Sequence, residues 1–164
     1  MNALESLLYE VSKLFLTPVL VVLGLMFVYA FFVLGTLLFD LAWSRLRGRA
    51  RQPLTAWARR HPGADQEALE LRLLKLLEPL KIVSRVAPML GLVATMIPMG
   101  PALVSVSSGN AQGIAQNLVV AFAAVIIALL SAAITYVVLS IRRRWLLEEL
   151  NALLGAGPSG GIHA

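Results

Sequence analysis

Three long apolar segments dominate the hydrophobic pattern of this chain, over residues 14–41, 85–106 and 117–141. At about 1.5 Å per residue, each is long enough to cross a hydrocarbon layer of about 30 Å as an α-helix. Between Val86 and Ile141 the chain contains no Asp, Glu, Lys, Arg or His. The pattern therefore predicts an all-α integral membrane protein with three transmembrane helices.

The polar segments predict the remaining organisation of the chain. Residues 1–13 are interpreted either as an interfacial helix or as the first turns of the first span, since their apolar residues share one helical face. Residues 42–84 are predicted to form a basic loop and then an amphipathic helix from Gln66 to Leu80, where leucines recur at helical spacing. Residues 107–116 are expected to form a short uncharged link, and residues 142–164 a short helix with a disordered tail.

The distribution of positive charge predicts the orientation in the membrane. Of the fourteen Lys and Arg residues, thirteen lie within residues 42–85 or after residue 141, and only Lys13 lies elsewhere. Because Lys and Arg concentrate on the cytoplasmic side of membrane proteins, the N-terminus is expected outside and the C-terminus inside. The arginines expected beside lipid at the membrane interface are Arg45, Arg47, Arg49, Arg51, Arg142, Arg143 and Arg144.

Composition narrows the possible classes of function. Hydrophobic residues make up 59% of the 164 residues, which is typical of an integral membrane protein. The net charge of +5 does not indicate nucleic-acid binding, because the basic residues lie at span ends and in one loop. Cysteine is absent, and His61 and His163 lie far apart in the sequence, so neither a disulfide nor a metal site is expected. Without paired carboxylates, a Ser/His/Asp set or a phosphate-binding glycine loop, neither enzyme activity nor a cofactor is predicted.

Hydroxyl side chains are the candidate chemistry of the second and third spans. An ion pathway in a membrane ordinarily needs an ionisable group, so a carboxylate would have to come from another polypeptide. This chain could line such a pathway with Thr95 from the second span and with Ser131 and Thr135 from the third. Ser131 and Thr135 are four residues apart and share a helical face. The alternative is that each hydroxyl bonds only a carbonyl of its own helix.

Small and helix-breaking residues in the same two spans predict close helix packing. The second span carries Pro88, Gly91 and Gly100, and such residues are tolerated in membranes where neighbouring helices cover the backbone. The third span carries alanines at four-residue spacing, a pattern that lets another backbone approach closely. An oligomeric helical bundle is therefore expected, with these alanines at a packed interface: Ala121, Ala124, Ala128 and Ala132.

One block of the second span is distinctive, namely APMLGLVATMIPM from Ala87 to Met99. An alanine-rich third span, IAQNLVVAFAAVIIALLSAAITYVV, follows it after a short link. Together these segments resemble the MotA/TolQ/ExbB proton-channel family, and the third span follows at the family's distance. The resemblance extends from about Leu74 to Val138, and the first span agrees in topology only.

The resemblance implies a channel subunit of an ion-driven, energy-transducing complex in the cytoplasmic (inner) membrane of a bacterium or archaeon. It implies a homo-oligomer, a pentamer, around a smaller partner that has one span with an aspartate and a periplasmic domain. Ion flow would be coupled to motion of that partner. Thr95 is the hydroxyl that the resemblance carries over to this chain.

The third span departs from the family's pattern. Ala124 and Val125 stand where the family has a small residue and a threonine, while Ala128 and Ile134 stand where it has a glycine and a proline. The alternative function is therefore a non-conducting structural or scaffold subunit that uses the same fold to anchor a membrane complex. Thr95 and the glycine–proline block favour the channel, whereas Val125 favours the scaffold.

Overall fold

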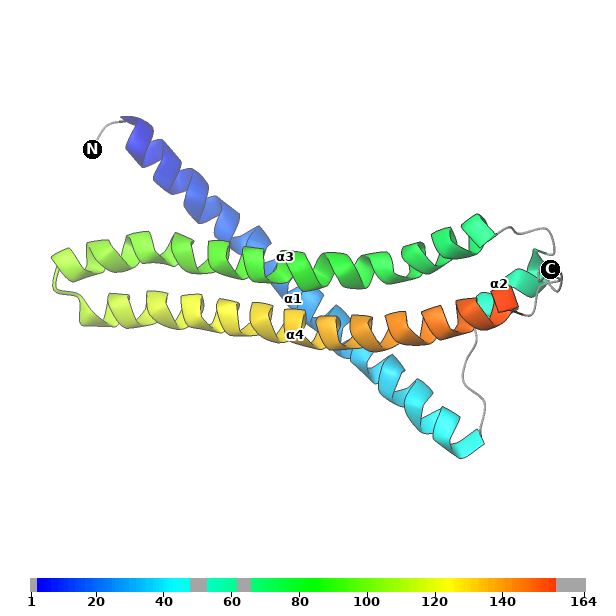
Figure 1. Cartoon of the computed structure of the whole chain (residues 1–164). Coiled ribbons are helices and arrows are strands. Elements are labelled where there is room, and N and C mark those ends of the chain that lie inside the picture. The colour runs from blue at the N-terminus through cyan, green and yellow to red at the C-terminus, as the bar shows by residue number, and fades with distance from the viewer. Residues whose placement is uncertain (1–2, 48–52, 62–65, 156–164) are drawn as a thin grey trace, which may run out of the picture.

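The computed structural model describes residues 3–47, 53–61 and 66–155. Almost all of these residues are helical, and no strand occurs among them. Figure 1 shows α3 and α4 side by side, while α1 crosses this pair diagonally and projects beyond it at both ends. The helices are α1 (Ala3–Arg47), α2 (Pro53–Arg60), α3 (Gln66–Ser107) and α4 (Ala111–Gly155).

The three predicted spans lie within α1, α3 and α4, and each of these helices is long and apolar enough to cross a membrane. This confirms the all-α fold and the three candidate membrane-spanning helices. α1 is continuous from Ala3 onward, so residues 3–13 and the first span belong to one helix.

The helix α3 continues through four prolines, Pro79, Pro88, Pro98 and Pro101. A proline inside a helix removes one backbone hydrogen bond and crowds the preceding turn, which bends the helix. In Figure 1, α3 bows gently along α4 and does not break. Pro98 is buried with the small residues of the α3 face that packs on α4, so the neighbouring helix covers the disturbed backbone there.

The link between α3 and α4 is shorter than the predicted residues 107–116, because α3 ends at Ser107 and α4 begins at Ala111. Asn110 accounts for the early start of α4. Its Oδ1 accepts a hydrogen bond from the Gly113 N–H at 3.0 Å, which is the geometry of a helix N-cap. Gly109 has a φ of 69°, a conformation that a residue without Cβ adopts at no steric cost.

Buried apolar side chains form two clusters, which divide the molecule along its length. The larger cluster joins all four helices at the end of the bundle that carries Arg142–Arg144, called here the basic end. It consists of Val33, Leu37, Leu54, Leu69, Leu73, Leu77, Leu80, Val138, Leu146 and Leu150. The smaller cluster, nearer the middle of the bundle, consists of Leu23, Ala94, Ala124 and Ala128.

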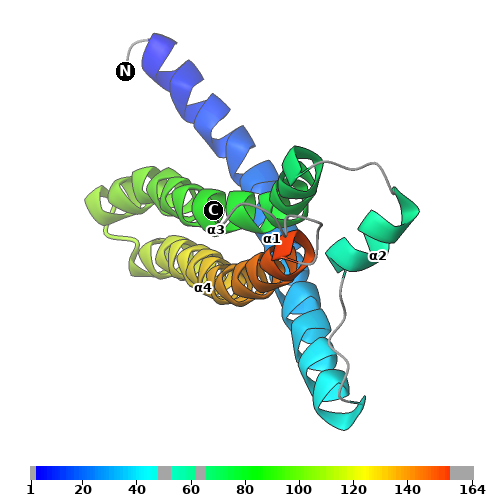
Figure 2. The same cartoon turned by 45° about the vertical axis from the view of Figure 1, so that its right-hand side comes forward.

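The short helix α2 lies beside the ends of α3 and α4 at the basic end (Figure 2). Its Leu54 is fully buried in the larger cluster. Glu149 of α4 accepts hydrogen bonds from the Thr55 N–H at 2.7 Å and from the Thr55 hydroxyl at 2.8 Å. The first N–H groups of a helix have no partner within it, so this carboxylate satisfies one of them and complements the helix dipole.

Candidate functional site

The helices α3 and α4 approach each other closely where Gly91 faces Ala128. A Cβ added to Gly91 would lie 2.5 Å from the Ala128 Cβ and 3.7 Å from the Val125 Cα. Non-bonded Cβ atoms essentially never come that close, so any residue other than glycine at position 91 would force the two helices to shift. The contact therefore constrains how α3 is rotated and positioned against α4 at this level of the two spans.

The alanine stripe of α4 packs against helices of its own chain. Ala121, Ala124, Ala128 and Ala132 are all buried within this single chain. The opposing face of α3 is also built from small residues and one proline. These are Ala87, Gly91, Ala94, Pro98 and Ala102, while Pro88 and Gly100 are half-buried beside them. The backbone that the stripe admits is thus α3, with Leu23 of α1 completing the cluster.

Thr95 lies beside the buried face of α3 and is partly exposed at the surface of the subunit. Its hydroxyl donates a hydrogen bond to the Leu92 carbonyl at 2.7 Å. A hydroxyl that donates one bond can still accept others, so Thr95 can offer a lone pair to a water molecule or to a polar group of a partner. It cannot itself carry a charge, so it can assist ion transfer but cannot hold the ion's counter-charge.

Ser131 and Thr135 lie together on α4 and are fully buried inside the subunit. The Ser131 hydroxyl donates to the Ile127 carbonyl at 2.7 Å, and the Thr135 hydroxyl donates to the Ser131 carbonyl. Each hydroxyl therefore donates its hydrogen bond to a backbone carbonyl of its own helix, which is the usual arrangement for such residues in membrane helices. Within one subunit, neither side chain reaches the outer surface.

The three predicted pathway residues do not converge in this subunit. Because Gly91 faces Ala128 and the two helices run in opposite directions, Thr95 lies near the level of Ala124. Ser131 is seven residues beyond Ala124, which is about 10 Å along a helix. Of the three predicted pathway residues, Thr95 therefore lies at the surface, whereas Ser131 and Thr135 form a separate buried pair.

Three of the predicted interfacial arginines, Arg142, Arg143 and Arg144, lie within α4, about three turns before its end. Arg142 is half-buried and contacts α1, whereas Arg143 is exposed. Arg144 is also exposed and forms an ion pair with Glu148 at 2.9 Å. Arg45 and Arg47 belong to the last turn of α1, and Arg49 and Arg51 lie outside the described residues.

Two polar contacts at the basic end were not predictable from the sequence pattern. Arg142 Nη2 donates to the Thr36 hydroxyl of α1 at 2.9 Å, and Glu149 binds the start of α2. Both join residues about a hundred positions apart, and a lone threonine or glutamate carries no local signal of such a partner. Among residues 3–47, 53–61 and 66–155, no cluster of His, Asp or Glu is suited to hold a metal ion.

The sequence itself shows which protein family the chain belongs to. The sequence model of the MotA/TolQ/ExbB proton channel family matches residues 46–153, which is more than half of the chain. The chain belongs to this family. The match to the MotA/TolQ/ExbB family covers α2, α3 and nearly all of α4, and therefore includes the Gly91–Ala128 contact and Thr95. Searches of curated proteins and of solved structures each found no match.

Membership of this family, with three apolar helices, makes the chain a multi-pass membrane protein of the proton-channel type. Almost all of α1 precedes the matched residues. The helices α2, α3 and α4 are thus the part of the molecule that the family model describes, and α1 crosses the α3–α4 pair from outside that part.

Proposed function

We propose that this chain is the channel subunit of an ion-driven, energy-transducing membrane complex and that a single-span partner supplies the ionisable group. The observation that carries the proposal is the uncharged interval from Val86 to Ile141, which includes both matched spans. A proton-channel subunit without a carboxylate in its second and third spans needs one from another polypeptide, because neutral hydroxyls cannot stabilise a moving ion alone.

Thr95 is the residue of this chain that we assign to the pathway. It is partly exposed on the subunit's surface, so a neighbouring helix can reach it, and its hydroxyl keeps the capacity to accept a hydrogen bond. In this proposal Thr95 positions water or the partner's carboxylate, and the partner's aspartate takes up and releases the ion. Ser131 and Thr135, expected from sequence to share this role, contribute to packing within the subunit instead.

The proposal includes the assembly and its orientation. Several copies, a pentamer by family resemblance, surround the single-span partner in the inner membrane of a bacterium or archaeon. The positive charge at the basic end supports a cytoplasmic location for that end, because Lys and Arg concentrate on the cytoplasmic side. The N-terminus is then outside.

Imaging of the complex tests this function most directly. The complex is purified from native membranes in mild detergent, imaged by electron cryomicroscopy, and analysed by mass spectrometry for its subunits. We expect a ring of copies that encloses a helix from a second polypeptide with one span and an aspartate in that span. A ring that encloses lipid alone would contradict the proposal.

The second candidate is a non-conducting scaffold with the same fold, and Val125 favours it. Val125 stands where the family has a threonine and lies next to Gly91 at the α3–α4 contact, so this part of α4 offers no hydroxyl. Proton flux into liposomes that contain the purified complex and a trapped pH-sensitive dye separates the two candidates. Flux above that of empty liposomes supports the channel, and a partner-bound complex without flux supports the scaffold.

A further inference from the structure

Two contacts fix which residues of α3 and α4 lie at the same level. Gly91 of α3 faces Ala128 of α4. Nearer the link between the helices, a Cβ added to Gly113 would lie 2.8 Å from the Ser105 Oγ. The two contacts are separated by almost the same number of residues on each helix. The antiparallel helices therefore stay in step, and each residue forward on one is matched by about one residue back on the other.

The same register extends from Gly91 to the basic end. It places Leu80 of α3 at about the level of Val138 of α4, and these two residues belong to one buried cluster. It also places Ile82 at about the level of Val137. The outer surfaces of the two helices can therefore be compared level by level.

The outer surface of α3 carries charge in this part of the bundle. Glu78, Lys81 and Arg85 are all exposed, and their spacing of three and four residues places them on one side of the helix. Arg85 lies near the level of Ile134, whereas the first charged residue of α4 is Arg142. α3 therefore becomes charged about 12 Å before α4 does, at about 1.5 Å per residue.

The outer surface of α4 is apolar at the levels where that of α3 is charged. Tyr136 and Val137 are 63% and 53% exposed. Exposed charge begins on α4 only at Arg143. At one depth, the two helices thus present surfaces that suit different surroundings, water for α3 and an apolar medium for α4.

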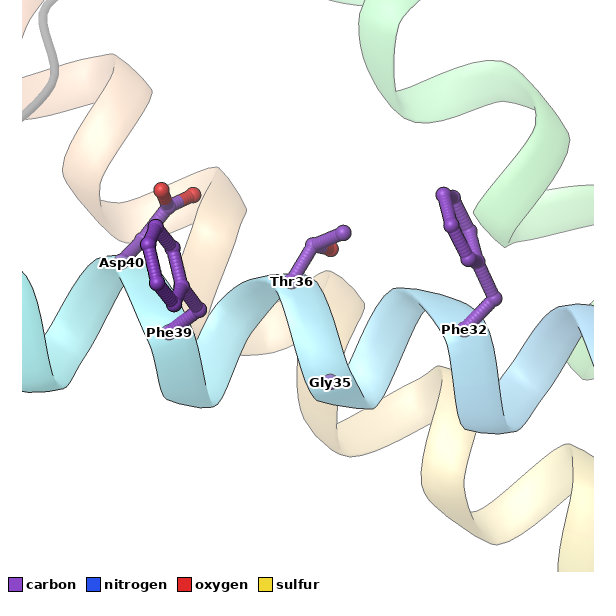
Figure 3. Close-up of a pocket in the computed structure, with 5 residues that line it drawn as sticks. All are labelled: Phe32, Gly35, Thr36, Phe39 and Asp40. Carbon is purple, nitrogen blue, oxygen red and sulfur yellow. The ribbon is translucent and has the colours of Figure 1, made fainter.

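The helix α1 agrees with α4 and not with α3. Its Thr36 accepts a hydrogen bond from Arg142 Nη2 at 2.9 Å, so α1 and α4 are at one level there. Phe32 and Phe39 project from the same side of α1 as Thr36 (Figure 3), and they are 69% and 62% exposed. The first charged residue beyond them is Asp40, which has an interaction of its own. The neutral surface of α1 therefore also ends near the contact with Arg142.

We propose that the face of α3 from Glu78 to Arg85 lines a water-filled mouth, which enters the membrane from the basic end. The apolar outer surfaces of α1 and α4 are shielded from water at the same depth. Charged side chains at membrane depth face water-filled cavities or other polar groups, because hydrocarbon excludes them. The mouth ends at Arg85, since α3 is neutral from Val86 onward.

The mouth shortens the dry part of the ion pathway, and this use of it rests on the proposed function. Thr95 is ten residues from Arg85, which is about 15 Å along a helix. Water that stopped at the level of Arg142 would leave about 27 Å of helix between itself and Thr95. The charged face of α3 thus brings water nearer to the hydroxyl that we assign to the pathway.

Cysteine labelling tests the mouth directly, because the chain contains no cysteine of its own. Single cysteines are introduced into the full chain, and the complex in open fragments of native membrane is treated with a charged, membrane-impermeant maleimide. Ile82→Cys and Val137→Cys are the matched pair, since they replace apolar side chains that are 50% and 53% exposed at the same level. Ile82→Cys is expected to react at least about tenfold faster, because hydrocarbon excludes a charged reagent.

Two further pairs mark the ends of the mouth. Lys75→Cys and Arg144→Cys lie beyond it, where both helices expose charged residues, and both are expected to react fast. Arg85→Cys and Ala133→Cys lie at its inner end, and only the first is expected to react fast. Labelling at about pH 9 limits the effect of neighbouring cations on the rates, because an unperturbed thiol has a pKa of about 8.5. Total thiol after unfolding and native gels of the complex normalise each rate to assembled protein.

Equally fast labelling of Ile82→Cys and Val137→Cys would show that water reaches both helices at this level, and it would overturn the proposal. Equally slow labelling would also overturn it, because the charged face of α3 would then be covered. If either substitution prevents assembly, the pair at the inner end decides in the same way. The labelling needs no ion flow, so a labelled mouth in a complex without flux would contradict the proposed function and support the mouth.

Discussion

Gly91 of α3 lies so close to Ala128 of α4 that a methyl group added to the glycine would come within 2.5 Å of the alanine Cβ. Without a hydrophobic effect between helices in lipid, association depends on close van der Waals packing. Two small residues face to face provide it here. The same contact sets the rotation of α3 on α4, and therefore decides which hydroxyls of the two spans are enclosed.

Gly91→Ala is expected to destabilise the subunit by about 1–3 kcal/mol, the usual cost of overpacking. Gly24→Ala is the matched control, because a Cβ at Gly24 has nothing within 4 Å and alanine is the better helix former. Denaturant unfolding in detergent, followed by circular dichroism, measures both. A Gly91 variant as stable as the parent would show that α3 and α4 can separate at no cost.

Glu149→Ala is expected to release α2 from the end of α4. The substitution removes two hydrogen bonds to one carboxylate, at 2.7 and 2.8 Å, and bonds to charged groups contribute about 1.5–3 kcal/mol each. Amide hydrogen exchange over Pro53–Arg60 should then quicken by at least about tenfold. Glu148→Ala removes only a solvent-exposed ion pair with Arg144, which contributes little, and should leave exchange in α2 unchanged. Equal effects of the two variants would contradict the capping role of Glu149.

Thr95→Val and Thr135→Val apply the same change to an exposed and to an enclosed hydroxyl. If the complex conducts as proposed, Thr95→Val is expected to abolish partner-driven work and ion flux while assembly stays intact. Thr135→Val should leave flux unchanged and stability within about 1 kcal/mol, because its hydroxyl bonds only a carbonyl of its own helix. Flux into dye-loaded liposomes and native gels of the assembled complex give the two readouts.

The outcome for these two variants also tests the division of the predicted pathway. Loss of flux in both would return the Ser131–Thr135 face to the pathway and imply that the subunit opens during transport. Full activity of Thr95→Val would remove Thr95 from the pathway.

Ala128→Leu is expected to destabilise the single chain, although the sequence pattern places Ala128 at a packed interface of an oligomeric bundle. Ala128 is fully buried in a single subunit, so the larger side chain should separate α3 from α4 before it affects any contact between copies. Unfolding of the isolated subunit distinguishes the two effects, because a defect confined to assembly would leave the subunit's own stability unchanged.

The apolar runs of the sequence predicted the three long helices. Where α4 begins, and which helices contact each other, depends on contacts that hydropathy does not show. The spans follow from the length of apolar runs, which neighbours do not alter. The start of α4 could not be predicted from hydropathy. Asn110 caps the helix, so α4 begins with polar residues that precede the apolar run. Similarly, Thr36 and Glu149 gave no sign of their partners, since each binds a residue on another helix.

The sequence by itself determined that three helices are apolar enough to cross a membrane, that two of them form a neutral stretch, and that positive charge gathers at one end. These are properties of residues taken along the chain. Only the tertiary structure decided that Thr95 stands at the surface while Ser131 and Thr135 are enclosed, and that Arg142 reaches α1. The direction of a side chain around a helix depends on how two helices pack, and a glycine–alanine contact between residues distant in sequence sets that packing here.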